Sequence, residues 1–198
     1  MAKPVFATAI LAQVGLAHSE YGSASGFVHG WMHPLGGLDH LLAMVAVGLW
    51  AAQLASGGDR RALWGVPLAF VAVMALGGLL GMLGLEVPLV ETGILLSVFL
   101  LGGLVLFAAR MQLGFGAVLV GLFTLFHGHA HGAEMPASVS GLEYALGFVL
   151  STALLHLMGI GAGLLSGQAT TLPALHKLPL LRLLGALVVL GGVMVMQA

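Results

Sequence analysis

The sequence predicts an all-α polytopic membrane protein, a helix bundle with six transmembrane helices that follow an N-terminal signal peptide. Of its 198 residues, 60% are hydrophobic and 7% are charged, whereas a soluble domain carries about 25% charged residues. The chain also contains 31 glycines, which are frequent in membrane helices because they let two backbones approach closely. Six apolar segments, each near the ~20 residues that a bilayer core requires, complete the prediction.

The first 17 residues have the composition of a secretory signal peptide. Lys3 precedes a mostly apolar run that ends in the small-residue pattern Gly15-Leu16-Ala17. This run is too short to span a bilayer, and a short uncleaved helix is the alternative. We expect cleavage after Ala17, which leaves His18 as the first residue and residues 18–198 as a single six-span domain.

The charged residues of the loops predict the orientation of the six spans. The expected spans cover residues 34–56, 64–85, 88–109, 112–131, 141–166 and 179–197. With this topology one side of the membrane receives every basic residue of the loops, namely Arg60, Arg61, Arg110, Lys177 and Arg182. The positive-inside rule assigns that side to the cytoplasm. We therefore expect a multi-pass protein of the bacterial inner membrane with both termini in the periplasm.

Composition also excludes several classes of function. The net charge is −1 and no basic cluster is present, so the sequence has no feature of a nucleic-acid-binding protein. The chain has no cysteine, which excludes disulfides and thiolate metal sites. No Walker motif is present, so we expect no ATP hydrolysis. Nine histidines exceed the six lysines and arginines, and any metal must bind imidazole, carboxylate or thioether groups.

The first candidate motif is HPLGGLDHLLAM, at the start of the first span. Pro34 suits the first turn of a helix, where its missing N–H loses no hydrogen bond. A helix that begins there places His33, Gly37, His40 and Met44 on one stripe, with Asp39 about 100° away. An ionisable residue in a membrane segment costs roughly 2.5 kcal/mol or more, and it indicates a functional site.

The second candidate motif is FHGHAHGAE, at the end of the fourth span. On a helix, His127, His131 and Glu134 share one face, whereas His129 points elsewhere. The expected topology places both motifs at the outer ends of their spans. Imidazole and carboxylate together suit nickel, cobalt, zinc or copper ions. We therefore predict one metal site with ligands from both motifs: His33, Asp39, His40, His127, His131 and Glu134.

Six further residues are secondary candidates, namely His18, His29, Met44, His129, Glu143 and His156. His156 lies deep in the fifth span, where it is either a second station for the ion or a histidine hydrogen-bonded between helices. Glu143 is either an outer ligand or an interfacial residue. For any single histidine, weak metal scavenging or a simple interhelical hydrogen bond is the alternative. The glycines of the second span, at positions 77, 78, 81 and 84, are expected to pack against another helix.

The two motifs together resemble the signatures of the HupE/UreJ family. The first match comprises His33, Pro34, Asp39, His40 and Met44; the second comprises Phe126, His127, Gly128, Ala130, His131, Gly132 and Glu134. The resemblance covers nearly the whole chain. It implies a hydrogenase or urease accessory membrane protein that imports nickel, or cobalt, from the periplasm. Residue 129 occupies a variable position of the motif, so the resemblance implies no role for His129.

We therefore expect a permease that imports Ni²⁺, with Co²⁺ or Zn²⁺ as alternative ions, and no enzyme. One alternative is an intramembrane zinc-dependent hydrolase, because imidazole and carboxylate ligands also suit a zinc-bound water. The other is a haem-binding or metal-sensing membrane protein, which needs histidines deep in two spans. The lipid bilayer and the metal ion are the only partners that the sequence predicts, and it does not predict an oligomeric state.

Overall fold

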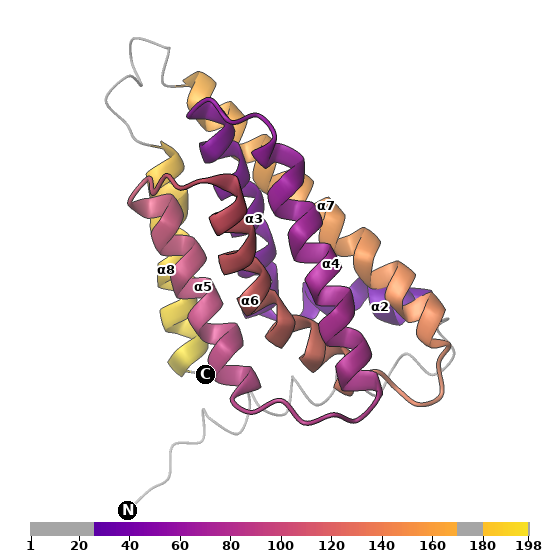
Figure 1. Cartoon of the computed structure of the whole chain (residues 1–198). Coiled ribbons are helices and arrows are strands. Elements are labelled where there is room, and N and C mark those ends of the chain that lie inside the picture. Colours follow the sequence, from indigo (N-terminus) through magenta and orange to yellow (C-terminus); the bar gives the residue numbers. More distant parts are fainter. Residues whose placement is uncertain (1–25, 170–179, 198) are drawn as a thin grey trace, which may run out of the picture.

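The computed structural model describes residues 26–169 and 180–197, and within these ranges every element is a helix (Figure 1). The helices are α2 (Gly26–Gly36), α3 (Leu38–Ser56), α4 (Ala62–Met82), α5 (Val90–Leu106), α6 (Leu113–Ala133), α7 (Gly141–Ala169) and α8 (Leu180–Gln197). The prediction of an all-α bundle is confirmed. The expected signal peptide, residues 1–17, lies outside the described residues, and so does His18.

Five of the described helices are long and apolar enough to cross a membrane, as judged by length and composition. They are α3, α4, α6, α7 and α8. The remaining expected span corresponds to α5, an apolar helix of 17 residues. It connects the loop after α4 to the loop before α6, so it also runs from one end of the bundle to the other (Figure 1). The chain is thus a multi-pass helical membrane protein, and the role of α5 as a sixth span stays a prediction.

The first span does not begin at Pro34 as expected. Pro34 lies inside α2. The helical conformation is interrupted at Gly37, whose backbone is extended with φ −108° and ψ 124°. The adjacent glycines 36 and 37 disfavour helix continuation, because glycine costs about 1 kcal/mol relative to alanine in a helix. His33 and His40 therefore lie on two different helices, and the predicted single stripe of ligands is wrong.

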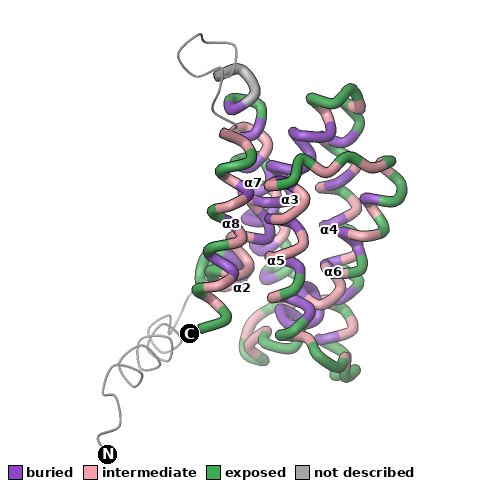
Figure 2. The backbone as a smooth tube through the Cα atoms, turned by 90° about the vertical axis from the view of Figure 1, so that its left-hand side faces the viewer, coloured by how far each residue is buried: buried purple, intermediate pink, exposed green. Residues whose placement is uncertain are grey.

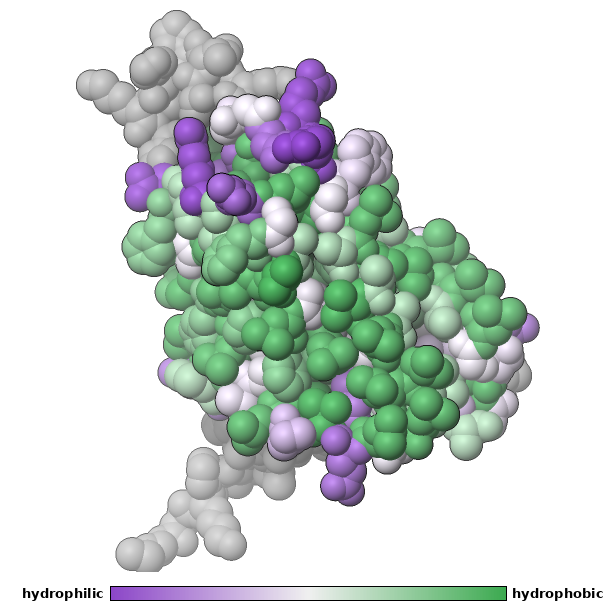
Figure 3. All heavy atoms as spheres, viewed as in Figure 1, coloured by the Kyte–Doolittle hydropathy of each residue, from purple (hydrophilic) through white to green (hydrophobic). Residues whose placement is uncertain are grey.

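Helix α3 lies at the centre of the bundle. Its side chains are buried almost continuously from Ala43 to Leu54 (Figure 2). The Trp50 ring is fully buried and its Nε1–H donates a hydrogen bond to the Ala109 carbonyl oxygen at 3.2 Å. The surrounding helices instead expose many leucines, and hydrophobic side chains cover the middle of the molecule (Figure 3). This apolar surface is what a bilayer requires of the helices that contact lipid.

Glycines bring α4 and α6 into backbone contact. A Cβ atom at Gly128 would collide with the Met74 carbonyl oxygen, and one at Gly132 would collide with the Gly78 carbonyl oxygen. From the other side, Cβ atoms at Gly77 and Gly81 would collide with the backbone of α6. The prediction that glycines of the second span pack against another helix is therefore confirmed at positions 77, 78 and 81.

Gly84 differs from that prediction. Its φ is +69°, and a Cβ atom there would meet no atom within 4 Å. This left-handed backbone conformation favours glycine, because a residue with a side chain is strained in it. Gly84 thus ends α4 with a turn and makes no helix contact.

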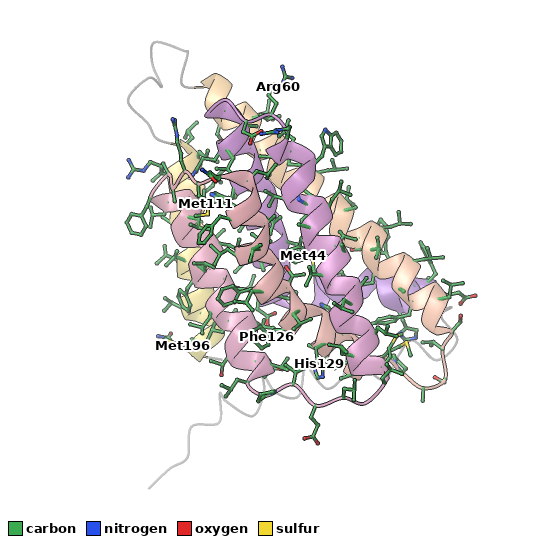
Figure 4. The ribbon with its side chains drawn as sticks, viewed as in Figure 1. Met44, Arg60, Met111, Phe126, His129 and Met196 are labelled. Atoms are coloured by element: carbon green, nitrogen blue, oxygen red, sulfur yellow. The ribbon has the colours of Figure 1, made fainter. Side chains whose placement is uncertain are left out.

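The described basic residues lie at the end of the bundle opposite the second motif. Arg60 and His129 mark these two ends, with Met44 between them (Figure 4). At the basic end the Arg182 Nε donates a hydrogen bond to the Leu106 carbonyl oxygen at 2.8 Å. The expected clustering of the loop arginines at one end is confirmed, whereas Lys177 lies outside the described residues. Which compartment this end faces stays a prediction.

Substituted-cysteine labelling tests that orientation, because the chain has no cysteine of its own. Ala137 and Ser56 are exposed at opposite ends of the bundle. We expect Ala137→Cys to react with a membrane-impermeant maleimide in intact spheroplasts. Ser56→Cys should react only after the membrane is opened. The reverse pattern would contradict the predicted orientation.

Candidate metal centre

Histidine side chains of the two motifs meet at one end of the bundle. The centroid of the His40 ring on α3 lies 5.0 Å from that of His127 and 4.4 Å from that of His131, both on α6. The His33 ring on α2 lies 4.6 Å from the His131 ring. The consecutive helices α2 and α3 and the distant helix α6 therefore contribute to one cluster of four imidazoles.

Contacts with α7 position α2, and with it His33. The Gly26 N–H donates a hydrogen bond to the Glu143 Oε2 at 3.1 Å, which satisfies a free donor at the start of α2. Gly30 packs against the Tyr144 carbonyl group, and a Cβ atom would not fit there. Glu143 thus joins α2 to α7, and it belongs to neither group of candidate ligands described next.

Two groups of candidate ligands share His131. One comprises His40, His127 and His131, and the other comprises His33, His131 and Glu134. In each group the ligand atoms lie within 4.8 Å of one another. Two atoms that bind one ion at about 2.1 Å are separated by about 4.2 Å at most. Small ring movements are therefore sufficient for either group to close around an ion.

A serine determines which nitrogen of His127 is available to a metal. The Ser97 hydroxyl donates a hydrogen bond to the Ile94 carbonyl oxygen at 2.6 Å, so its oxygen accepts one from the His127 Nε2–H at 2.7 Å. The Nδ1 of His127 then carries the lone pair. This atom is buried and has no hydrogen-bond partner among the described residues, so its lone pair is free to bind a metal ion.

Asp39 does the same for His40. Its Oδ1 accepts hydrogen bonds from the His40 Nδ1–H and from the His40 backbone N–H, both at 2.8 Å. The His40 Nε2 then carries the lone pair, and it too is buried without a partner in the described part of the chain. A carboxylate that accepts the second N–H of a ligating histidine orients the ring and raises its basicity. Asp39, a predicted ligand, lies in neither ligand group and has the geometry of such an orienting residue.

His131 is buried, with only 3% of its surface exposed, and within the described ranges neither of its ring nitrogens has a hydrogen-bond partner. A buried polar group without a partner costs about 1–3 kcal/mol. The Phe148 ring packs against it with a centroid distance of 4.1 Å. His131 is therefore held in place by aromatic contacts and is available to an ion from either ligand group.

The second ligand group reaches the surface. The His33 Nε2 lies 3.2 Å from the Glu134 Oε2, and the two side chains are 20% and 57% exposed. His127, in the first group, is fully buried. Exposure thus decreases from Glu134 through His33 and His131 to His127, so the candidate ligands extend from the surface into the interior of the bundle.

Comparison with known proteins agrees with this arrangement. The family model for HupE / UreJ proteins matches residues 6–195. The chain belongs to the HupE / UreJ family. It is also 46% identical over 186 residues to Protein HupE of Rhizobium leguminosarum bv. viciae, an alignment that covers 93% of this chain and 92% of that protein. No solved structure matches the chain.

The secondary candidates that the structure of this HupE / UreJ protein describes lie outside both ligand groups. His129 turns away, as the sequence predicts, and its Nε2 is 2.7 Å from the Leu85 carbonyl oxygen. His29 is half-buried on α2. Met44 is fully buried and its sulfur accepts a hydrogen bond from the Thr152 hydroxyl at 3.4 Å. His156 is buried on α7 beside Phe70.

Four residues of the site were not predicted from the sequence. Ser97 orients His127, while Tyr144 and Phe148 surround His33, and Phe148 also contacts His131. Phe70 contacts His127, with ring centroids 6.2 Å apart. A buried serine in an apolar helix is a signal that could have been used, because polar residues in membrane helices bond across helices. The aromatic residues of apolar helices carry no such signal.

Replacement of Ser97 tests whether the orientation of His127 matters. Ser97→Ala should weaken nickel binding to the purified protein by about 10–100-fold, the usual effect of losing a residue that orients a metal ligand. Ser166→Ala is the matched control, because among the described residues that buried hydroxyl donates its hydrogen bond to Ala162 of its own helix. Isothermal titration in detergent measures both. Equal affinities of Ser97→Ala and wild type would show that the Ser97 hydrogen bond does not prepare the site.

Proposed function

We propose that this HupE / UreJ protein imports a divalent transition-metal ion across the bacterial inner membrane, nickel first and cobalt second, for the maturation of hydrogenase or urease. The observation that carries the proposal is the convergence of His40, His127 and His131, whose buried ring nitrogens include four without a hydrogen-bond partner in the described part of the chain. Lone pairs that point to one place in a membrane protein are a binding site for a cation.

The chemistry of the ligands favours a borderline metal ion. Imidazole binds nickel, cobalt, zinc and copper well, whereas calcium and magnesium prefer oxygen ligands. The chain has no thiolate to favour a softer ion. Because affinity alone does not separate nickel from zinc, the proposal of nickel depends on the resemblance to hydrogenase and urease accessory proteins.

The second ligand group supports a pathway for capture. Glu134 and His33 are exposed enough to replace part of the hydration shell of an ion from the periplasm. His131 belongs to both groups, so it can hold the ion while His33 and Glu134 are exchanged for His40 and His127. At every step the ion keeps protein ligands, which avoids the large cost of a bare charge in low dielectric.

The driving force in this proposal is the membrane potential, because the sequence has no nucleotide-binding motif. A potential of 100 mV, negative inside, favours entry by about 2.3 kcal/mol per charge. A divalent ion therefore gains about 4.6 kcal/mol per 100 mV. With the basic end of the bundle in the cytoplasm, the histidine cluster faces the periplasm and the import direction follows.

Uptake of radioactive nickel and cobalt by whole cells tests this function. Cells that lack other nickel importers should accumulate nickel at least tenfold faster with the protein than without it. His40→Ala and His131→Ala should abolish the gain while the protein stays in the membrane, because each removes a ligand of the buried group. His176→Ala is the control, since the sequence places it at the opposite side of the membrane. Equal uptake with and without the protein would contradict transport, and equal loss in His176→Ala would contradict the role of the outer cluster.

A further inference from the structure

His156 is a buried histidine that the outer cluster does not use. Its side chain is 2% exposed, and neither ring nitrogen has a hydrogen-bond partner among the described residues. A histidine that serves only to connect helices would bond to a partner on a neighbouring helix, and His156 bonds to none in the described ranges. In the neutral imidazole one of these nitrogens carries a lone pair, which is thus available to a metal ion.

His156 lies near the middle of the membrane-spanning bundle. Gly48, near the midpoint of α3, packs so closely on the backbone of α7 that a Cβ atom would collide with the His156 carbonyl oxygen. His40, by contrast, lies in the first turn of α3. Eight residues of helix separate Gly48 from His40, about 12 Å along the axis. The backbone of His156 therefore lies about two helical turns deeper than that of His40.

Phe70 on α4 separates the two places. Its ring centroid lies 6.2 Å from that of His127 and 4.8 Å from that of His156, and the edge of one ring meets the face of the other in the second contact. The Phe70 side chain is 1% exposed. One buried aromatic ring therefore contacts a histidine of the outer cluster on one side and His156 on the other.

Further side chains with oxygen or sulfur atoms that can bind a metal ion lie about one helical turn from His156, toward the outer cluster. Thr152 precedes His156 by four residues on α7 and donates its hydroxyl hydrogen to the Met44 sulfur at 3.4 Å. Met44 lies four residues after His40 and four before Gly48, so these three positions share one face of α3. The Ser151 hydroxyl is also buried and has no partner within the described part of the chain. A thioether and hydroxyls thus lie between the outer cluster and His156.

We propose that His156 is a second, inner metal-binding station at mid-membrane depth, which receives the ion from the outer cluster past Phe70 and Met44. This proposal rests on the proposed function. One imidazole with weak thioether, hydroxyl or water ligands binds a borderline ion less tightly than the three imidazoles of the outer cluster. That order suits transport, because an ion must bind well enough to enter a site and weakly enough to leave it.

The test is equilibrium binding of nickel alone to the purified protein in detergent, with the outer cluster disabled by the triple variant His40→Ala, His127→Ala and His131→Ala, which removes all three buried imidazoles. We expect this variant to keep one nickel site, about 10- to 100-fold weaker than the wild-type site. His156→Phe in the same background should abolish that weak site, because it keeps an aromatic ring against Phe70 but removes both nitrogens. His156→Gln is the second variant in case the phenylalanine is not accepted. His129→Gln is the matched control for His156→Gln, and it should leave the weak site unchanged.

Two further measurements separate the proposal from the proposed function. In the otherwise wild-type chain, His156→Phe should leave the affinity of the outer site within twofold of wild type, yet reduce whole-cell nickel uptake at least tenfold. If wild-type protein binds nickel but transports none, the proposed function fails by itself. The inner station is overturned if the weak site in the triple variant is absent or survives both His156 variants, or if His156→Phe transports nickel at the wild-type rate.

Discussion

The backbone contact between α4 and α6 is the constraint on which the candidate metal centre depends. Along α6 each of two glycines directly follows a histidine, at 127–128 and again at 131–132. Gly128 and Gly132 allow one face of α6 to pack directly against the carbonyl groups of α4. The neighbouring face of α6 then directs His127 and His131 toward His40. A side chain larger than hydrogen at either glycine would separate α4 from α6 and move both imidazoles. The glycines of the motif thus position its histidines.

Hydrogen bonds to one ring nitrogen of His40 and one of His127 fix the orientation of these two rings. Asp39 and Ser97 each accept the N–H of one histidine and leave the opposite nitrogen with its lone pair directed inward. In an apolar bundle such nitrogens are costly without a partner, so a cation that binds them removes a penalty that the folded protein otherwise carries. The same physical reasoning applies to His156, whose two nitrogens have no partner in the described part of the chain.

Much of the fold and most of the cluster were predictable from the sequence, for different reasons. Apolar segments and glycine spacing predict membrane helices because the bilayer imposes length and polarity on each segment separately. The candidate ligands were singled out because a histidine such as His127 is conspicuous in an apolar helix. The break at Gly37 was missed, since Pro34 is equally compatible with the start and the end of a helix in the pattern alone. Ser97 and Phe70 were missed because their roles arise from packing between helices, which no local pattern records.

The central claim is that histidines from both motifs bind one ion. X-ray absorption spectroscopy of the protein loaded with one equivalent of nickel tests it most directly, because the outer-shell scattering counts the imidazoles on the metal. We predict about three imidazole nitrogens at roughly 2.1 Å in the wild type. One imidazole should be lost in His40→Ala and one in His127→Ala, since each motif contributes to the same ion. A wild-type spectrum with only oxygen ligands, or an imidazole count that neither variant lowers, would contradict a metal centre shared by the two motifs.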